Sequence, residues 1–368
     1  MSESRPRVQL TRGVPPVESF PIAQLAECAA AVLHEYGDVV LQYAPVRGFA
    51  PLRALLAREA GVDDDRVIVG QGSLQLQDFC ARYLLGTGSV VYVEEPSYDR
   101  ALTIIRRAGG QLVGFPLEED GPDIDAVEAR LESGERPKYF YVIPDFQNPS
   151  GAVLSLEKRQ RLATLARAYE FWIVEDVPYR RLRYRGEEYP TLFELAPDRV
   201  IQMSSYSKLV SPGMRVGYVI APASLAGPLA KMAEDTYIGP SYLNQAIIYE
   251  YIRRGWLEPN IARLCELYEP RLGATLSALE QHLADLATWQ RPDGGFFVGV
   301  TLRFEVSADE LLERARAANL ILTDGRGFFP GCDVENFVRI PFCALTPEEI
   351  NEGVVRLAEV LRGLVQAV

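Results

Sequence analysis

The stretch "RVIQMSSYSKLVSPGMRVGYVI", residues 199–220, places two apolar runs on either side of a polar loop that holds a lysine and an arginine. The runs "RVIQMS" and "RVGYVI" predict two buried strands. Between them, Lys208 lies among serine and tyrosine hydroxyls, and Arg215 follows a Pro-Gly turn. Two interpretations are open: a solvated polar loop, or an anion site beside a lysine held for covalent chemistry. The rest of the chain has to decide between them.

Outward from this stretch, short apolar runs alternate with helical patterns between about residues 65 and 221. Most of the runs are continuously apolar, which is typical of strands covered by helices on both faces of a mainly parallel sheet. Residues 155–170 predict an amphipathic helix with Ser155 as its N-cap. The alternation indicates an α/β fold. The predicted strands are "RVIVG" (66–70), "SVVYVE" (89–94), "QLVGF" (111–115), "YFYVI" (139–143), "FWIVED" (171–176), "RVIQMS" (199–204) and "RVGYVI" (215–220).

From about residue 255 the pattern changes to longer helical stretches around a few short strands. This change predicts a second, smaller α+β lobe, which the first 40 or so residues join in space. We therefore expect a large domain over residues 45–250 and a small domain formed by residues 1–44 and 251–368.

The composition is that of a globular protein with an acidic balance. A formal net charge of -12 over 368 residues argues against nucleic acid or an anionic membrane as the main partner. We see no signal-peptide pattern at the start and no apolar run long enough to cross a bilayer. The five cysteines form no C-x-x-C pair, which is typical of a reduced, cytoplasmic protein. With His34 and His282 as the only histidines, a multi-histidine metal site is excluded and no metal is expected.

Polar side chains follow several predicted strands, and ligands of an open α/β sheet bind beyond the carboxyl ends of its strands. Gly72 and Ser73 open a helix whose free N–H groups suit a phosphate, although Gly-Ser can also be a plain cap. Asn148 stands before a proline and is either a ligand contact or a turn residue. Asp176 ends an apolar run, where a carboxylate either needs a partner or caps the next helix.

Together these groups describe one ligand. It carries a phosphate for Ser73, Ser205 and Arg215. It also carries a group that pairs with Asp176 and an aldehyde for Lys208. Pyridoxal 5'-phosphate has all three, because its ring nitrogen is a stronger electron sink when an aspartate keeps it protonated and its aldehyde forms a Schiff base with a lysine. The chain lacks the G-x-G-x-x-G fingerprint and the Walker lysine, so neither NAD nor ATP is indicated.

With these residues in place, the chain resembles the class I/II aminotransferases, the fold-type-I enzymes that depend on pyridoxal phosphate. It is most similar to the branch of 2-aminoadipate and related broad-specificity aminotransferases. The resemblance implies a large domain with a mostly parallel seven-stranded sheet between helices, plus a smaller α+β domain. The matching stretches run in family order over nearly the whole length: "GVPPVESFP" (13–21), "LQYAPVRGFAPLR" (41–53), "GQGSLQ" (70–75), "VEEPSYD" (93–99), "YVIPDFQNPSG" (141–151), "VEDVPYRRLRY" (174–184), "SSYSKLVSPGMRVGY" (204–218) and "FVRIPF" (337–342).

The resemblance also implies a role for each site residue. Lys208 would form the internal aldimine and then move the proton between Cα and C4'. Asp176 would pair with the pyridinium nitrogen, and Tyr98 would stack on the ring; these three are the predicted catalytic residues. The predicted cofactor-binding residues are Asn148 and Tyr179 on the phenolic oxygen, Ser73, Leu74, Ser205, Ser207 and Arg215 on the phosphate, Tyr98, Asp176 and Lys208 as above, and Tyr43 on the phosphate of the neighbouring subunit.

For the substrate, the resemblance implies that Arg339 clamps the carboxylate through a bidentate pair. From the sequence alone, a surface arginine on a strand is the other interpretation. Asn148, Gly13 and Arg12 complete the predicted substrate-binding set. Arg12 stands where the family commonly has the first glycine of a GGxP stretch that closes over the substrate, so the choice of substrate stays open.

The implied function is the transfer of an amino group between an L-amino acid and a 2-oxo acid, in a cytoplasmic homodimer with its active sites at the interface. The main alternative is another pyridoxal-phosphate reaction on the same fold, such as that of a lyase or a cyclase, because this scaffold supports several reactions at Cα. A non-catalytic binding or regulatory module and a nicotinamide-dependent oxidoreductase are more distant alternatives.

Overall fold

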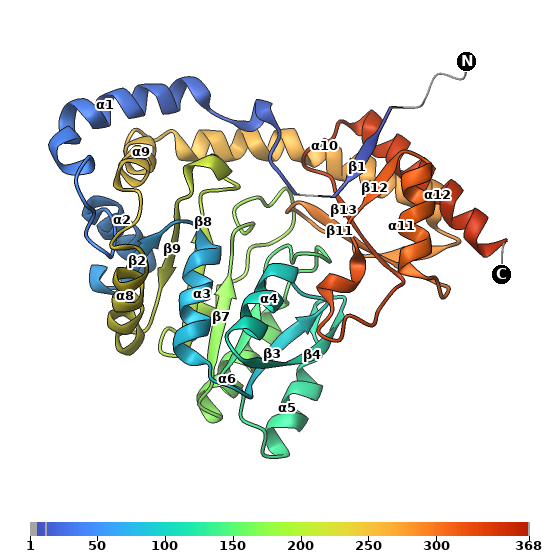
Figure 1. Ribbon diagram of the computed structural model, residues 1–368, viewed down its shortest axis with the longest axis horizontal. Helices are drawn as coiled ribbons and strands as arrows, with labels where there is room; N and C mark the ends of the chain where they lie inside the picture. The colour runs from blue at the N-terminus through green and yellow to red at the C-terminus, as the bar shows by residue number, and fades with distance from the viewer. Residues whose placement is uncertain (1–5, 12, 367–368) are drawn as a thin grey trace.

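The computed structural model describes residues 6–11 and 13–366, and it contains a large helix-covered sheet with a smaller lobe beside it (Figure 1). The strands of the large sheet are β2 (Val67–Gly70), β3 (Ser89–Glu95), β4 (Gly110–Glu118), β5 (Gly121–Pro122), β6 (Tyr139–Val142), β7 (Trp172–Asp176), β8 (Val200–Ser205) and β9 (Gly217–Ile220). Their order is β2-β9-β8-β7-β6-β3-β4-β5. The five strands from β8 to β4 are mutually parallel, and β9 runs antiparallel to both of its neighbours. The predicted α/β class with a mostly parallel sheet is confirmed.

Two details of the sheet differ from the prediction. Within the described residues the sheet has eight strands instead of seven, because the two-residue strand β5 adds a short antiparallel hairpin to the edge strand β4. A Gly-Pro pair is too short to produce an apolar run in the sequence. The last strand also begins at Gly217, two residues later than expected, because Arg215 has a left-handed backbone with φ of 51°.

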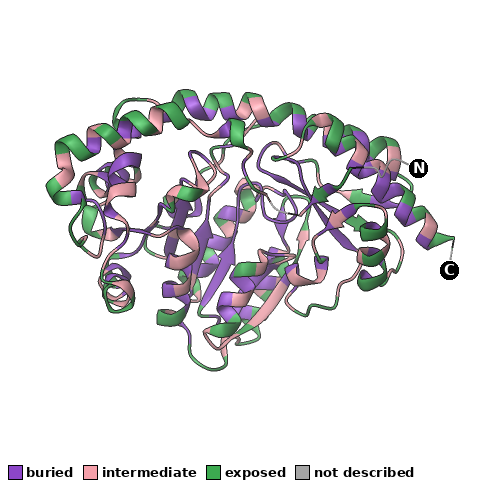
Figure 2. Cartoon of the chain, turned by 45° about the horizontal axis from the view of Figure 1, so that its top comes forward, coloured by how far each residue is buried: buried purple, intermediate pink, exposed green. Residues whose placement is uncertain are grey.

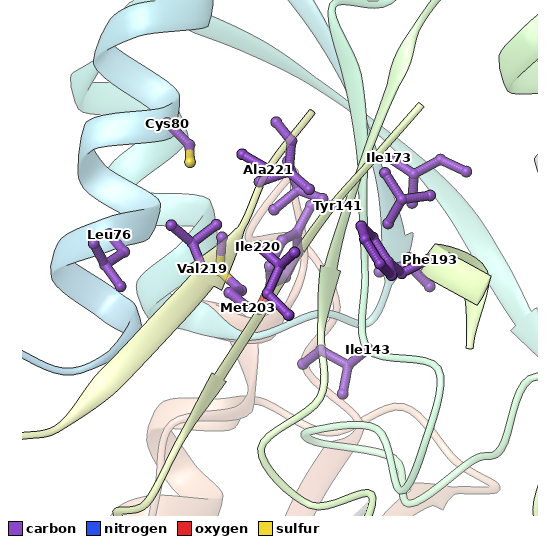
Figure 3. Packing of buried hydrophobic residues seen from close by; sticks show 14 of the residues in the cluster. Leu76, Cys80, Tyr141, Ile143, Ile173, Phe193, Met203, Val219, Ile220 and Ala221 are labelled. Atoms are coloured by element: carbon purple, nitrogen blue, oxygen red, sulfur yellow. The ribbon is translucent and has the colours of Figure 1, made fainter. Parts of the chain in front are cut away.

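Helices pack against the sheet, and the strands between them form the buried centre of the molecule (Figure 2). Ser155 caps α6 as predicted, since its side chain accepts a hydrogen bond from the Lys158 N–H. Leu76 and Cys80 of α3 point toward Val219 of β9 in the core (Figure 3). The helices of this region are α1 (Ile22–Val40), α2 (Ala50–Ala60), α3 (Ser73–Leu84), α4 (Asp99–Arg107), α5 (Ile124–Glu132), α6 (Leu156–Ala168), α7 (Leu192–Leu195), α8 (Ala223–Tyr237) and α9 (Tyr242–Arg253).

The smaller lobe is built around two small sheets, one antiparallel with the order β10-β11-β13 and one in which β1 pairs in parallel with β12. Through β1, a segment from near the start of the chain, residues 8–10, joins the C-terminal lobe. The elements of this lobe are β1 (Val8–Leu10), α10 (Leu257–Leu283), β10 (Ala287–Trp289), β11 (Phe297–Leu302), α11 (Ala308–Ala317), β12 (Leu320–Leu322), β13 (Phe337–Pro341) and α12 (Pro347–Val365).

The long helix α10 connects the two parts of the molecule along one side (Figure 1). Leu264 and Tyr268 pack into the hydrophobic cluster of the large sheet, whereas Leu272 and Leu279 belong to the cluster of the smaller lobe. The division at residues 45 and 250 stays a prediction. In the part of the chain that the structure describes, no helix has the length and apolar character that a membrane crossing requires.

Candidate active site

A cavity of about 230 Å³ lies at the edge of the sheet where β2, β6, β7 and β8 end. It brings together residues that are far apart in the sequence, as expected for the carboxyl edge of an α/β sheet. The lining residues are Ser73, Leu74, Gln77, Tyr98, Ile143, Asn148, Asp176, Pro178, Tyr179, Ser205, Ser207, Lys208, Pro212 and Arg215. All the catalytic residues predicted from the sequence are among them, and so are all the predicted cofactor-binding residues except Tyr43.

Lys208 follows the end of β8, and its side chain is half-buried where it lines the cavity. The Nζ atom donates a hydrogen bond of 2.8 Å to the backbone oxygen of Gly13 and lies 5.4 Å from the centre of the Phe296 ring. Burial lowers the pKa of this amine, and the nearby cations Arg339 and Arg215 lower it further. A lowered pKa raises the share of neutral amine, which is the form that attacks an aldehyde.

Asp176 is the last residue of β7, and only half of its carboxylate is satisfied. The Oδ2 atom accepts a hydrogen bond of 2.9 Å from the Tyr141 hydroxyl, whereas the buried Oδ1 atom has no hydrogen-bond partner. Burial raises the pKa of Asp176 to about 7, against the effect of the Tyr141 hydrogen bond. The neighbouring Glu175 caps α7, where it accepts bonds from the N–H groups of Leu192 and Phe193 at 2.7 and 3.1 Å. Asp176 is thus free of the capping role that the sequence left open for it.

The start of α3 and the turn before β9 form a cradle of hydrogen-bond donors. Gly72 precedes the helix with φ of 89°, and a Cβ at this position would lie 2.3 Å from Nη2 of Arg215. The Arg215 guanidinium donates to the backbone oxygen of Gln71 at 3.0 Å. Ser205 donates to the Ser207 hydroxyl at 2.7 Å. Free N–H groups at a helix start, hydroxyls and a guanidinium together are suited to a phosphate.

Arg339 belongs to β13 of the smaller lobe and reaches the same region. It is buried, with 7% of its surface exposed, so the alternative of a surface arginine is excluded. Its Nη1 donates to Oδ1 of Asn148 at 2.9 Å, and its Nη2 donates to the backbone oxygen of Thr11 at 2.6 Å. The guanidinium lies between the rings of Phe297 and Phe328, 4.6 Å from the centre of each. The side chain is therefore held flat from two sides while its Nε atom, also buried, has no partner.

The residues present fit pyridoxal phosphate. The unpartnered Oδ1 of Asp176 is a buried acceptor that a protonated ring nitrogen would satisfy. The cradle around Arg215 offers donors for a phosphate ester, and Lys208 offers an amine for an aldehyde. The ring of Tyr98 lines the same cavity. The ring nitrogen, the phosphate and the aldehyde of the cofactor each find a matching group at one cavity.

Three of the predicted residues that the structure describes, Tyr43, Gly13 and Arg339, are not among those that line the cavity. Arg339 reaches a lining residue through its bond to Asn148. Tyr43 is 82% exposed. Arg12 lies outside the described residues. Gly13 is placed by its bond to Lys208, and a Cβ there would lie 2.3 Å from the Phe297 ring.

Sequence reasoning also missed two polar residues at the site. Tyr141 holds Asp176, and Gln77 is a buried residue of α3 whose Nε2 atom has no partner. Tyr141 sits in a run of apolar residues that reads as a core strand. Only the pairing of β6 with β7 brings it to the aspartate. Gln77 is the one polar position on the buried face of α3, and this signal was readable in the sequence.

Known proteins resemble the chain over its full length. The sequence matches the family model described as aminotransferase class I and II over residues 6–357. It is 37% identical to the 2-aminoadipate transaminase of Thermus thermophilus over 97% of this chain and 90% of that protein. It is 33% identical to the aromatic-amino-acid aminotransferase 1 of Thermococcus litoralis over 96% of this chain and 88% of that protein. The crystal structure of the Thermus thermophilus alpha-aminoadipate aminotransferase, complexed with N-(5'-phosphopyridoxyl)-L-leucine, superimposes with a TM-score of 0.94 at 36% identity, covering 98% of this chain and 94% of that one.

Proposed function

The chain belongs to the class I and II aminotransferases, and we propose that it transfers an amino group between an L-amino acid and a 2-oxo acid with Lys208 as its catalytic lysine. As a member of this family it is an aminotransferase of fold type I that uses pyridoxal phosphate. The observation that carries the proposal is the convergence on one cavity of a half-buried amine with a lowered pKa, at Lys208, and a buried carboxylate oxygen without a partner, at Asp176.

Each predicted residue that lines the cavity has a task in this proposal. Pyridoxal phosphate supplies the electron sink that weakens the bonds at the substrate Cα. Asp176 keeps the ring nitrogen protonated, and Lys208 accepts the Cα proton and delivers it back. Asn148 and Tyr179 would donate to the phenolic oxygen, and Tyr98 would pack on the ring. The backbone of Ser73 and Leu74 would hold the phosphate together with Ser205, Ser207 and Arg215.

Arg339 is proposed to bind the carboxylate of the amino acid, with Asn148 and the backbone of Gly13 beside it. Its flat position between Phe297 and Phe328 supports this role, since a fixed guanidinium presents two parallel donors to a carboxylate. Arg12 stays a candidate for the distal end of the substrate. The names of the relatives suggest 2-aminoadipate and aromatic amino acids as the first donors to try.

We also propose that the active form is a homodimer in which Tyr43 reaches the phosphate of the neighbouring subunit. Val39, Leu41 and Tyr43 support this, because they are exposed apolar or aromatic side chains at the end of α1 and just beyond it, 46%, 70% and 82% accessible in the single chain. A cytoplasmic location is proposed as well, and the five cysteines, all free in the structure, are in keeping with it.

The test follows the cofactor without an amino acceptor. Protein loaded with pyridoxal phosphate is mixed with L-2-aminoadipate or an aromatic L-amino acid, and absorption spectra and product analysis follow the reaction. We expect stoichiometric conversion of the cofactor to pyridoxamine phosphate with release of the 2-oxo acid, and reversal when 2-oxoglutarate is added. Release of ammonia without the pyridoxamine form would instead indicate a lyase.

Two lysine variants locate the chemistry. Lys208→Ala should abolish turnover. The control is Lys231→Ala, which removes an exposed lysine of α8 that pairs with Glu234 and Asp235, and it should keep full activity. Turnover of Lys208→Ala at the wild-type rate would refute the assignment.

A further inference from the structure

Among the described residues, the Tyr141 hydroxyl is the one hydrogen-bond donor to the Asp176 carboxylate. Strands β6 and β7 are parallel neighbours, and their register sets Tyr141 opposite Val174. Asp176 lies two residues further along β7, so side-chain alternation puts it on the same face of the sheet as Tyr141. The phenol is fully buried, and its oxygen lies 2.9 Å from Oδ2 of Asp176.

We propose that Tyr141 is a positioning residue that orients the Asp176 carboxylate, favours its ionised form and leaves Oδ1 for a ligand in the cavity. The inference rests on the proposed function for its consequence in catalysis, and on the geometry alone for its effect on the carboxylate. The hydroxyl occupies Oδ2, so only Oδ1 remains for a ligand. A donated hydrogen bond stabilises the charged form of a carboxylate and weakens its hold on a proton. An aspartate that keeps its own proton cannot be the anionic partner of a ring nitrogen.

The other groups around Asp176 do not replace this donor. Tyr98 and Tyr179 are two further titratable side chains that interact with the Asp176 charge. Burial raises the pKa of both, and Asp176 raises it further, so they stay neutral at working pH. Burial likewise keeps the Tyr141 phenol protonated and able to donate. Gln77 lines the same cavity from α3 but makes no hydrogen bond to the carboxylate. The ionisation of Asp176 thus depends on a single hydroxyl opposing burial.

The first experiment uses the full chain without cofactor. Aspartate labelled with ¹³C at the carboxyl carbon is titrated by NMR in wild type, Tyr141→Phe and Tyr139→Phe, and Asp176→Asn assigns the signal. Tyr139 is the matched control, because it lies on the same face of β6, is equally buried and does not line the cavity. We expect the acid dissociation constant of Asp176 to fall roughly tenfold or more in Tyr141→Phe. In Tyr139→Phe it should stay at the wild-type value.

The second experiment uses the protein loaded with pyridoxal phosphate. For Tyr141→Phe we expect the pH profiles of kcat and of the cofactor absorption to move toward alkaline pH, with KM for the amino acid unchanged. In the protein with Asp176, Tyr141→Phe should raise the dissociation constant of the cofactor roughly tenfold. In the Asp176→Asn protein, the same substitution should hardly change it. Tyr139→Phe should reproduce the wild-type profiles.

Several outcomes would overturn the inference. One is an Asp176 titration in Tyr141→Phe that matches Tyr139→Phe. Another is a loss of activity in Tyr141→Phe with an unchanged pH profile, which would mean that the hydroxyl serves packing alone; thermal unfolding of both variants measures that contribution. The titration needs no turnover. A wild-type protein that fails to transaminate would therefore refute the proposed function. The titration would still decide separately whether Tyr141 controls the ionisation of Asp176.

Discussion

At the scale of single residues, Lys208 and Asp176 are both pushed toward their neutral forms by burial. The pKa of Lys208 is lowered, and the pKa of Asp176 is raised to about 7. The cations that affect Lys208 are Arg339 and Arg215, which add to the effect of burial. Burying a charged amine or a charged carboxylate costs free energy. A cofactor that presents an aldehyde to the amine and a protonated nitrogen to the carboxylate would offset both of these costs. We therefore expect cofactor binding itself to set the charge states of Lys208 and Asp176.

Asp176→Asn should stabilise the cofactor-free protein at alkaline pH while it impairs catalysis. The folded pKa of Asp176 lies above the ordinary value of 3.8, so the folded state keeps a proton that the unfolded chain has already lost. The stability that depends on this group is present below pH 4 and is lost as the pH rises toward 7. The step from 3.8 to about 7 corresponds to at most about 4 kcal/mol. Unfolding curves at pH 5 and pH 8 test this, and a variant with the wild-type pH dependence would contradict it.

Arg339→Lys should weaken substrate binding more than it slows turnover. A lysine keeps the charge but loses the flat pair of donors and the packing between Phe297 and Phe328. A hydrogen bond to a charged group is worth about 1.5–3 kcal/mol, so KM should rise roughly tenfold to a hundredfold. The control is Arg303→Lys, at an exposed position after β11. Equal KM values for the two variants would refute the assignment of Arg339 to substrate binding.

At the scale of elements, the site consists of strand ends and one helix start. Continuous apolar runs followed by polar residues are a local signal in the sequence, and three residues that follow such runs, Asn148, Asp176 and Lys208, line one cavity in the structure. The role of Tyr141 was not predictable, because a tyrosine inside an apolar run reads as core until the register of β6 against β7 is known. Strand β5 was not predicted for a different reason: a strand of two residues is too short to show a periodic pattern.

Gly72→Ala tests whether the start of α3 is built around Arg215. Alanine at φ of 89° is strained, and its Cβ would displace the Arg215 guanidinium, which lies 2.3 Å away. We expect the dissociation constant of pyridoxal phosphate to rise at least roughly tenfold. The control is Gly88→Ala, which also has a positive φ, of 80°, but meets nothing within 4 Å. Gly88→Ala should lower the stability by about 1–2 kcal/mol and leave the affinity for the cofactor unchanged. If Gly72→Ala and Gly88→Ala bound the cofactor equally well, the proposed phosphate cradle would be contradicted.

At the scale of the whole molecule, the site is assembled by three parts of the chain. The large sheet contributes the residues that line the cavity, and the smaller lobe contributes Arg339, which donates to Asn148. The segment that leads from β1 toward α1 passes over both, since the backbone oxygens of Thr11 and Gly13 accept from Arg339 and Lys208. The position of that segment could not be predicted from its sequence, because it is set by the pairing of β1 with β12 more than 300 residues away.

A fourth part of the site is expected from a second copy of the chain, and complementation tests it. Tyr43→Ala and Lys208→Ala should each be inactive as pure dimers if Tyr43 serves the neighbouring subunit. When the two variants are unfolded together and refolded as a mixture, some dimers contain one subunit of each variant. In a mixed dimer one site has an intact Lys208 from one subunit and an intact Tyr43 from the other, so about a quarter of all sites should recover activity. Tyr83→Ala, at another exposed tyrosine on α3, should be active by itself and serves as the surface control. A mixture as inactive as its components, while sedimentation shows mixed dimers, would place Tyr43 in its own subunit's site or in none.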